Sequence, residues 1–198
     1  MRQYPKGFSL PELVVVLAIF GLMTLVSLPV FSNLLEQNSL QTACNEVAAI
    51  LTQARGRAAL SGADVGVKWI SVGGDLVLTL YEDRNGNGVT TEDIRKGIDR
   101  LVAGPYWMKG RYPHIDFSFV PGFDGIDPNG DPVGKLDDAI KFGRSDICTF
   151  SPVGKASPGS VYLSNRKARQ AMVRVTPMTA RISTWTWHGK KGKWIRRW

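Results

Sequence analysis

Residues 7–31 read GFSLPELVVVLAIFGLMTLVSLPVF, and this stretch decides the fold. Between Phe8 and Phe31 the only charged residue is Glu12. Because a helix rises about 1.5 Å per residue, this 24-residue segment is long enough to cross the apolar core of a bilayer, about 30 Å thick. We therefore predict a transmembrane helix over residues 8–31, preceded by a short segment over residues 1–7.

This short segment carries the basic residues Arg2 and Lys6 and ends at Gly7. No small-x-small cleavage site follows the apolar run, which argues against an ordinary secretory signal. The string G-F-S-L-P-E-L instead resembles the class III signal of type IV prepilins. The resemblance implies that residues 1–7 are a leader, and that a prepilin peptidase cuts between Gly7 and Phe8 and methylates the new Phe8 amine. Glu12 is then the fifth residue of the mature chain, where most pilins and pseudopilins carry a glutamate.

Glu12 has two physical interpretations. A carboxylate inside a membrane-length apolar segment is costly without a partner, and the N-terminal amine of a neighbouring subunit would provide one. Such a pair would set the axial register of a filament, which gives Glu12 an assembly role. The alternative is a glutamate at a helix start, where the helix dipole favours negative charge.

The apolar pattern continues beyond Pro29 with spacings of three and four residues. This periodicity predicts an amphipathic helix over residues 32–62 that continues into a globular domain and ends at Gly62. Pro29 should kink or locally open the helix, or mark the end of its membrane part. Residues 51–60 resemble the helix end of the GspH/FimT family of minor pilins.

The next part of the chain reads as β structure. Two strands, Val65–Ile70 and Asp75–Tyr81, are joined by Gly73-Gly74, which is a hairpin signal. Further short strands are expected near residues 101–103, 115–120, 147–151, 160–163, 171–176 and 181–187. The predicted fold class is α+β, with a long N-terminal helix packed on an antiparallel β-sheet or sandwich domain over residues 63–187 and a basic, Trp-rich tail over residues 188–198.

The order of these features again resembles the GspH/FimT family. The strings Y-E-D-R-N-G-N-G and F-S-P-V-G-K-A-S-P-G-S-V-Y-L lie where that family carries similar segments. The resemblance covers nearly the whole chain. Residues 121–140 look like an insertion.

Two cysteines, Cys44 and Cys148, are the only ones in the chain, and no CxxC or Cys/His cluster accompanies them. They are candidates for one disulfide if the domain lies outside the cytoplasm, or they are two free, buried thiols. The spacing in sequence does not decide between these alternatives.

Acidic and amide side chains at Asp83, Asn85 and Asn87 match the first half of a calcium loop. The twelfth position of such a loop is Ile94 and not Glu, so a tight exposed turn is the competing interpretation and no metal or cofactor is expected. The two histidines, His114 and His188, belong to no catalytic motif. We therefore expect a protein that is not an enzyme.

The C-terminal part is strongly basic. Residues 166–198 hold ten Lys or Arg and no acid, although the whole chain has a net charge of only +8. Four of the six tryptophans lie after residue 184. Basic and indole side chains together suit DNA, an anionic membrane or cell-surface polymer, or a contact with another pilin. The candidate DNA- or anion-binding residues are Arg174, Arg181, Lys190, Lys191, Lys193, Trp194, Arg196, Arg197 and Trp198, with Arg166, Lys167 and Arg169 nearby.

The resemblance implies a minor pilin or pseudopilin that assembles into, or primes, a type IV pilus or a type II secretion pseudopilus. The alternative is a FimT-like minor pilin that binds DNA during uptake for natural transformation. The implied partners are other pilins or pseudopilins, the inner-membrane assembly platform, the prepilin peptidase, the inner membrane and, in the alternative, DNA. The implied location is the inner membrane, crossed once, with the C-terminal domain in the periplasm, or a filament at the cell surface.

Overall fold

A computed structural model describes residues 9–189 and 192–197, and the side chains of these residues except 25–37 and 188. The chain forms two compact units, Met1–Gln37 and Asn38–Trp198. The first unit contains the beginning of helix α1, and the second contains the rest of α1 and all the strands.

Helix α1 runs from Leu10 to Ser61 and comprises 52 residues. Its helical assignment is continuous through Pro29, so the alternative that the helix ends there is wrong. The helix ends as predicted at Gly62, which takes a φ of 70° and donates its N–H to the carbonyl of Ala58 at 3.1 Å. Within the described part of the chain, no helix combines the length and the apolar character that crossing a membrane requires. The predicted membrane span over residues 8–31 is therefore not confirmed.

The first sheet, sheet A, has the strand order β3-β2-β1-β5, and all its pairs are antiparallel. Its strands are β1 (Val65–Val72), β2 (Asp75–Glu82), β3 (Arg100–Trp107) and β5 (Ile147–Phe150). Gly73 and Gly74 have φ values of 60° and 87° between β1 and β2. Two successive positive φ values are what a two-residue hairpin turn requires, so the predicted hairpin is confirmed.

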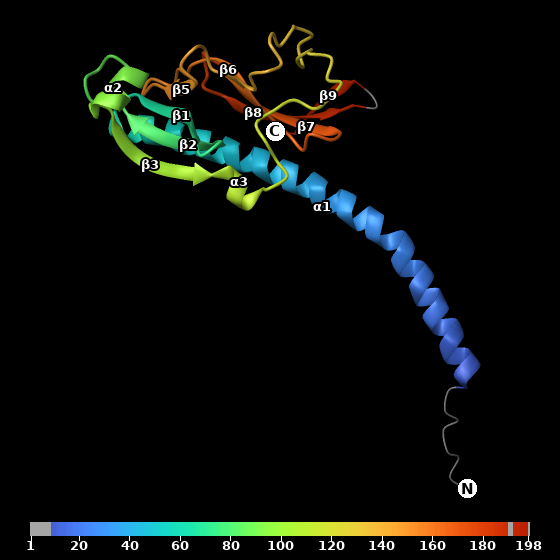
Figure 1. The fold of residues 1–198 in the computed structure, drawn as a ribbon. Coiled ribbons are helices and arrows are strands. Elements are labelled where there is room, and N and C mark those ends of the chain that lie inside the picture. The colour runs from blue at the N-terminus through green and yellow to red at the C-terminus, as the bar shows by residue number, and fades with distance from the viewer. Residues whose placement is uncertain (1–8, 190–191, 198) are drawn as a thin grey trace. The chain divides into compact units, whose positions relative to one another are not determined.

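The second sheet, sheet B, is also antiparallel and has the order β4-β6-β7-β8-β9. Its strands are β4 (Ile140–Lys141), β6 (Gly159–Ser164), β7 (Arg169–Val175), β8 (Ile182–His188) and β9 (Lys193–Arg196). Two short helices, α2 (Thr91–Lys96) and α3 (Met108–Arg111), flank β3 in sequence (Figure 1). Strand β9 lies inside the predicted tail, and its pairing with β8 extends the β domain beyond residue 187.

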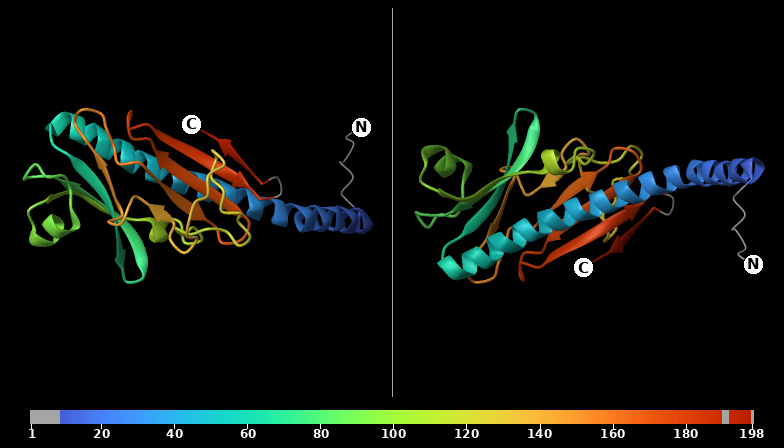
Figure 2. Two further views of the ribbon diagram at one scale, coloured as in Figure 1. Left: turned by 90° about the horizontal axis from the view of Figure 1, so that it is seen from above. Right: turned by 90° about the horizontal axis from the view of Figure 1, so that it is seen from below.

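One hydrophobic core joins the second part of α1 to both sheets. Leu51, Ala54 and Ala58 of the helix are fully buried, together with Val67 of sheet A and Val173 of sheet B. Small alanine side chains let the helix backbone come close to the sheets, and the views in Figure 2 show the helix running along them. The α+β fold class with a helix packed on antiparallel sheets is confirmed.

The strand predicted over residues 115–120 is wrong. Asp116 forms only an isolated bridge with Ser164. Phe117 and Phe119 are instead packed against the face of sheet B that carries Tyr162 and Met172. Packing on a sheet face buries these aromatic rings without a strand partner, which a pattern of apolar residues cannot distinguish from strand pairing.

Candidate functional site

The N-terminus of α1 is capped by hydrogen bonds between Ser9 and Glu12. Ser9 precedes the first helical residue, and its carbonyl accepts the N–H of Leu13 at 3.2 Å. The Oε2 atom of Glu12 accepts the Ser9 backbone N–H at 3.4 Å and the Ser9 hydroxyl at 3.3 Å. This is the capping-box arrangement of a serine at the N-cap and a glutamate three residues later. Within one chain, Glu12 therefore acts as the helix-start glutamate, and its pairing with a neighbour's amine stays a prediction.

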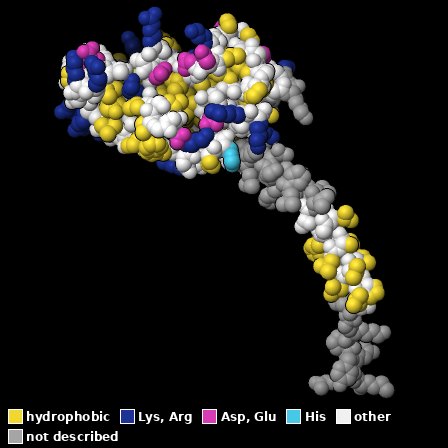
Figure 3. Space-filling model, in the orientation of Figure 1, with side chains coloured by type: hydrophobic (Ala, Val, Ile, Leu, Met, Phe, Trp, Pro, Cys, Tyr) yellow, Lys and Arg dark blue, Asp and Glu magenta, His cyan; other side chains and the backbone are white. Residues whose placement is uncertain are grey.

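Apolar side chains surround Glu12 and are exposed. Leu10, Leu13 and Phe20 are 80%, 55% and 62% exposed. The band of hydrophobic side chains on this part of α1 is visible in Figure 3. The hydroxyl of Thr24 donates to the carbonyls of Phe20 and Gly21, so this polar side chain is satisfied by its own helix. An exposed apolar surface of this kind marks a contact with lipid or with other protein chains.

Residues 2–28 match the family model of the prokaryotic N-terminal methylation motif. The match supports a type IV pilin-like protein, and it fits inner-membrane anchoring or incorporation into a filament. The motif also suggests, in general terms, that the chain interacts with other pilins and with the prepilin peptidase. No curated protein and no solved structure matches this chain. The predicted cleavage pair, Gly7 and Phe8, lies outside the described residues.

The tryptophans of this pilin-like chain's C-terminal hairpin are largely packed. Trp187 and Trp194 face each other across β8 and β9, and both contact the ring of Phe123 edge to face. The indole N–H of Trp194 donates to the carbonyl of Ile126 at 2.8 Å. These two rings hold the insertion, residues 121–140, against sheet B. They are therefore not free platforms for stacking nucleic-acid bases. Trp198 lies outside the described residues.

Arg196 is the last residue of β9, and Arg197 follows it. Their side chains lie on opposite faces of the hairpin, because successive residues of a strand point to opposite sides. The guanidinium of Arg196 lies 5.8 Å from the ring centroid of Trp185. The Nε of Arg197 donates to the hydroxyl of Thr186 at 3.2 Å. Both arginines are exposed.

Arg174 is an internal residue and not part of a basic surface. Its guanidinium lies 2.5 Å from a carboxylate oxygen of Asp127, and the two side chains are only 17% and 12% exposed. Its Nε also donates to the hydroxyl of Ser160 at 3.2 Å. Burial acts to raise the pKa of Asp127, but the backbone N–H of Asp131 and the Arg174 guanidinium outweigh it, so the pKa lies below its usual value. The pair joins the insertion to β7.

The remaining basic residues divide between the two ends of sheet B. Arg181 is exposed in the β7–β8 turn, and Arg197 lies near it because its N–H donates to the carbonyl of Thr184 at the start of β8. Lys193 is exposed at the opposite end of the hairpin. Lys190 and Lys191 lie outside the described residues.

Asp83 holds its own loop together. One carboxylate oxygen accepts the N–H groups of Asn85 and Gly86 at 3.0 and 2.9 Å, and the other accepts that of Gly88 at 2.7 Å. The amide of Asn87 donates to Asp93 at 3.0 Å. These contacts are those of the tight turn that was the alternative to a calcium loop. In the described part of the chain, no group of three or more His, Cys, Asp or Glu side chains is placed to hold a metal ion.

The two thiols are buried and unjoined in the structure. The sulfur of Cys44 lies 3.8 Å from the carbonyl of Met172, and that of Cys148 lies 3.9 Å from the carbonyl of Ser157. Burial raises the pKa of Cys44 to about 12 and also raises that of Cys148. Both cysteines therefore behave as small core residues in this structure, which is the second of the two alternatives that the sequence left open.

A shallow polar pocket of about 350 Å³ lies between two loops that the sequence did not connect. One wall contains Asn87 and Gly88, and the other contains Ser151, Lys155 and Ser157. The pocket thus joins the Asn/Gly turn to the Ser/Pro/Gly segment before β6. The two segments are separated by about 60 residues in sequence, and no local sequence signal predicts that they lie side by side.

Proposed function

We propose that this chain is a minor pilin or pseudopilin that assembles into, or primes, a type IV pilus or a type II secretion pseudopilus. The observation that carries the proposal is the methylation motif over residues 2–28. Glu12 lies within this motif, in the capped first turn of a helix whose apolar side chains are exposed. The globular unit then serves as the part displayed by the filament. Its order of elements, a long helix, a hairpin and a basic C-terminal hairpin, supports membership of the GspH/FimT branch. The role is structural, not catalytic.

The proposal places residues 8–31 in the inner membrane as a single span before assembly, with the globular unit in the periplasm. The exposed apolar side chains between Leu10 and Met23 support this location. In a filament, the same side chains would pack against neighbouring helices.

Processing by a prepilin peptidase tests the proposal directly. When the full chain is co-expressed with that peptidase, intact-protein mass spectrometry is expected to show loss of residues 1–7 and gain of one methyl group on Phe8. A Gly7→Leu variant should stay uncut, because the residue before the cut must fit the peptidase. Gly21→Ala is the matched control, since a Cβ added at Gly21 meets nothing within 4 Å. An uncut wild-type leader in the presence of active peptidase would overturn the proposal.

DNA uptake is a second candidate function, and the exposed arginines at the start of β8 and the end of β9 favour it. Because Trp187 and Trp194 are packed, these two rings do not offer a stacking surface, and we expect binding to depend on phosphate contacts. We expect salt-sensitive binding of fluorescent duplex DNA by the full chain in detergent.

Each lost phosphate contact reduces the slope of log binding constant against log salt by about 0.9. An Arg181→Ala/Arg197→Ala variant should therefore reduce that slope by about 2. Lys155→Ala is the control, since Lys155 is also exposed but lies in the β5–β6 turn. If the wild-type chain showed no salt-sensitive DNA binding, DNA uptake would be ruled out as a function and the filament role would remain.

A further inference from the structure

Four basic side chains gather at one end of sheet B. Arg166 and Lys167 are exposed in the β6–β7 turn, Arg169 begins β7, and Lys193 begins β9. Arg169 pairs with His188 across β7 and β8, and His188 pairs with Lys193 across β8 and β9, so these residues stand at one level of the sheet. We call Arg166, Lys167, Arg169 and Lys193 the basic end.

The basic end lies at the end of the second unit that also contains its first residue, Asn38. At the middle of β7, the carbonyl of Met172 lies 3.8 Å from the sulfur of Cys44, which is six residues after the unit's first residue, Asn38. Beyond the C-terminal end of β7, the carbonyl of Pro177 accepts the N–H of Ala156.

Ala156 bridges to Phe150, which in turn pairs with Val65, four residues after the end of α1. Strand β7 and the second part of α1 therefore run in the same direction. Their beginnings share one end of the unit, as the ribbon in Figure 1 also shows.

Among the described residues, two acidic side chains near this region, Asp116 and Glu46, contact basic side chains. Asp116 contacts Arg166 at 3.0 Å and also the ammonium group of Lys109. Glu46 of α1 contacts Arg111 and accepts the hydroxyl of Tyr112 at 2.8 Å. Asp116 and Glu46 together contact three bases, so these two acids by themselves do not neutralise the basic end.

We propose that the basic end binds the anionic phospholipid headgroups of the membrane that holds the N-terminal segment. This inference rests on the membrane anchoring in the proposed function, because the anchored segment is joined in sequence to Asn38, which begins the globular unit. Lys and Arg near an anionic surface each strengthen binding roughly fivefold, and the attraction falls off within a Debye length. The basic end would orient the unassembled subunit on the membrane until it is extracted into a filament.

The test uses the full chain in nanodiscs of phosphatidylcholine, with or without phosphatidylglycerol. Hydrogen exchange of the backbone amides at residues 166–169 is measured at low and high salt. We expect at least about fivefold slower exchange on the anionic discs at low salt, and equal exchange on both discs at high salt. A Lys167→Glu/Lys193→Glu variant should lose the protection, and a Lys167→Gln/Lys193→Gln variant should lose part of it.

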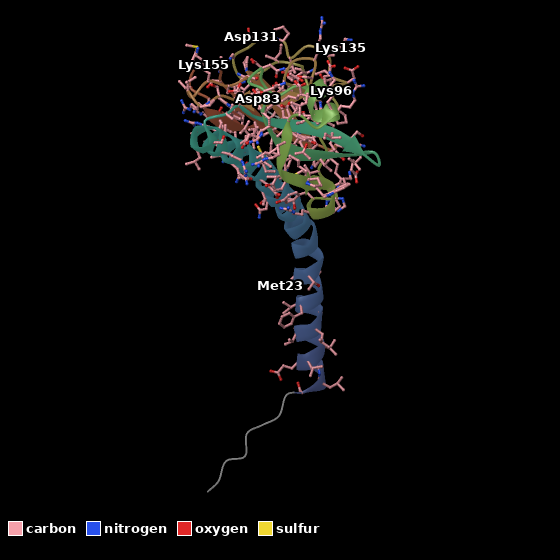
Figure 4. All side chains as sticks on the ribbon, turned by 90° about the vertical axis from the view of Figure 1, so that its left-hand side faces the viewer. Met23, Asp83, Lys96, Asp131, Lys135 and Lys155 are labelled. Carbon is pink, nitrogen blue, oxygen red and sulfur yellow. The ribbon has the colours of Figure 1, made fainter. Side chains whose placement is uncertain are left out.

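The matched control is Arg95→Glu/Lys155→Glu, which makes the same change of charge at two exposed residues on α2 and the β5–β6 turn. Figure 4, drawn from the side where α2 and β5 lie, labels Lys155. This variant should keep the full protection of residues 166–169. If residues 166–169 were equally protected in the Lys167→Glu/Lys193→Glu variant and in this control, the inference would be contradicted.

Four further outcomes separate this inference from others. Equal exchange on both discs at low salt would overturn it, as would protection of residues 166–169 by duplex DNA on phosphatidylcholine discs without protection by phosphatidylglycerol. A chain that stays uncut by the peptidase but is protected on anionic discs would instead overturn the pilin assignment and leave the lipid contact standing. A chain that co-purifies with neither disc would remove the anchor and, with it, the lipid contact.

Discussion

A Glu12→Gln variant is expected to reach the membrane fraction at the wild-type level but to enter filaments at least about tenfold less well, because an unscreened charge pair in an apolar environment would be lost. Glutamine can still accept the Ser9 N–H in a capping box, so the helix start is retained while the charge is removed. The measurement is the amount of this chain in sheared filaments relative to the membrane fraction, by quantitative immunoblot.

Ser9→Ala is the matched control for the first experiment. It removes the hydroxyl that donates to Glu12 at 3.3 Å but leaves the carboxylate in place. If the carboxylate serves a neighbouring subunit, Ser9→Ala assembles well and Glu12→Gln does not. Loss of assembly in Ser9→Ala alone would instead show that Glu12 only stabilises its own helix.

Breaking the Asp127–Arg174 pair is expected to have the largest effect on stability. Asp127→Asn leaves the largely buried Arg174 guanidinium without its countercharge, which costs about 3 kcal/mol in the free energy of unfolding of the globular unit. The measurement is urea unfolding of the full chain in detergent, followed by tryptophan fluorescence, because Trp187 and Trp194 pack against the insertion that Asp127 anchors. Asp131→Asn, at an exposed position in the same loop, is expected to change stability by less than about 0.5 kcal/mol.

The same pair gives a pH dependence of defined sign. The folded-state pKa of Asp127 lies below that of the unfolded chain, where an aspartate titrates near about 3.9. The contribution of Asp127 is therefore complete above that pH and is lost as the pH falls through the lowered folded-state pKa. The stability difference between wild type and Asp127→Asn should shrink only in acid. A difference that instead shrinks between pH 6 and 8 would assign the effect to another group.

The prediction of α1 succeeded because its signals are local. Ser9 and Glu12 mark its start, and Gly62 provides the left-handed residue that follows its last turn. Helix α2 was missed although a similar signal exists. Thr90 caps it by accepting the N–H of Asp93 at 3.1 Å, which is the pattern of Thr followed three residues later by an acid.

The C-terminal tail shows the limit of composition. Clustered Trp, Lys and Arg predicted a binding surface, but Trp187 and Trp194 pack on the insertion and Arg174 pairs with Asp127. The separations along the chain are 47 residues for the Arg174–Asp127 contact and 68 for the Trp194–Ile126 contact. Nothing in the sequence around either partner indicates the other.

By itself, the sequence determined the methylation motif, the long helix with both of its ends, the hairpin at Gly73-Gly74 and the α+β class, since caps, turns and periodicity act between residues close in the chain. Only the tertiary structure decided which basic residues stay exposed, where the insertion lies and which ends of sheet B carry charge. Those properties depend on strand order and on contacts between distant segments, which are fixed when the whole unit buries its apolar surface.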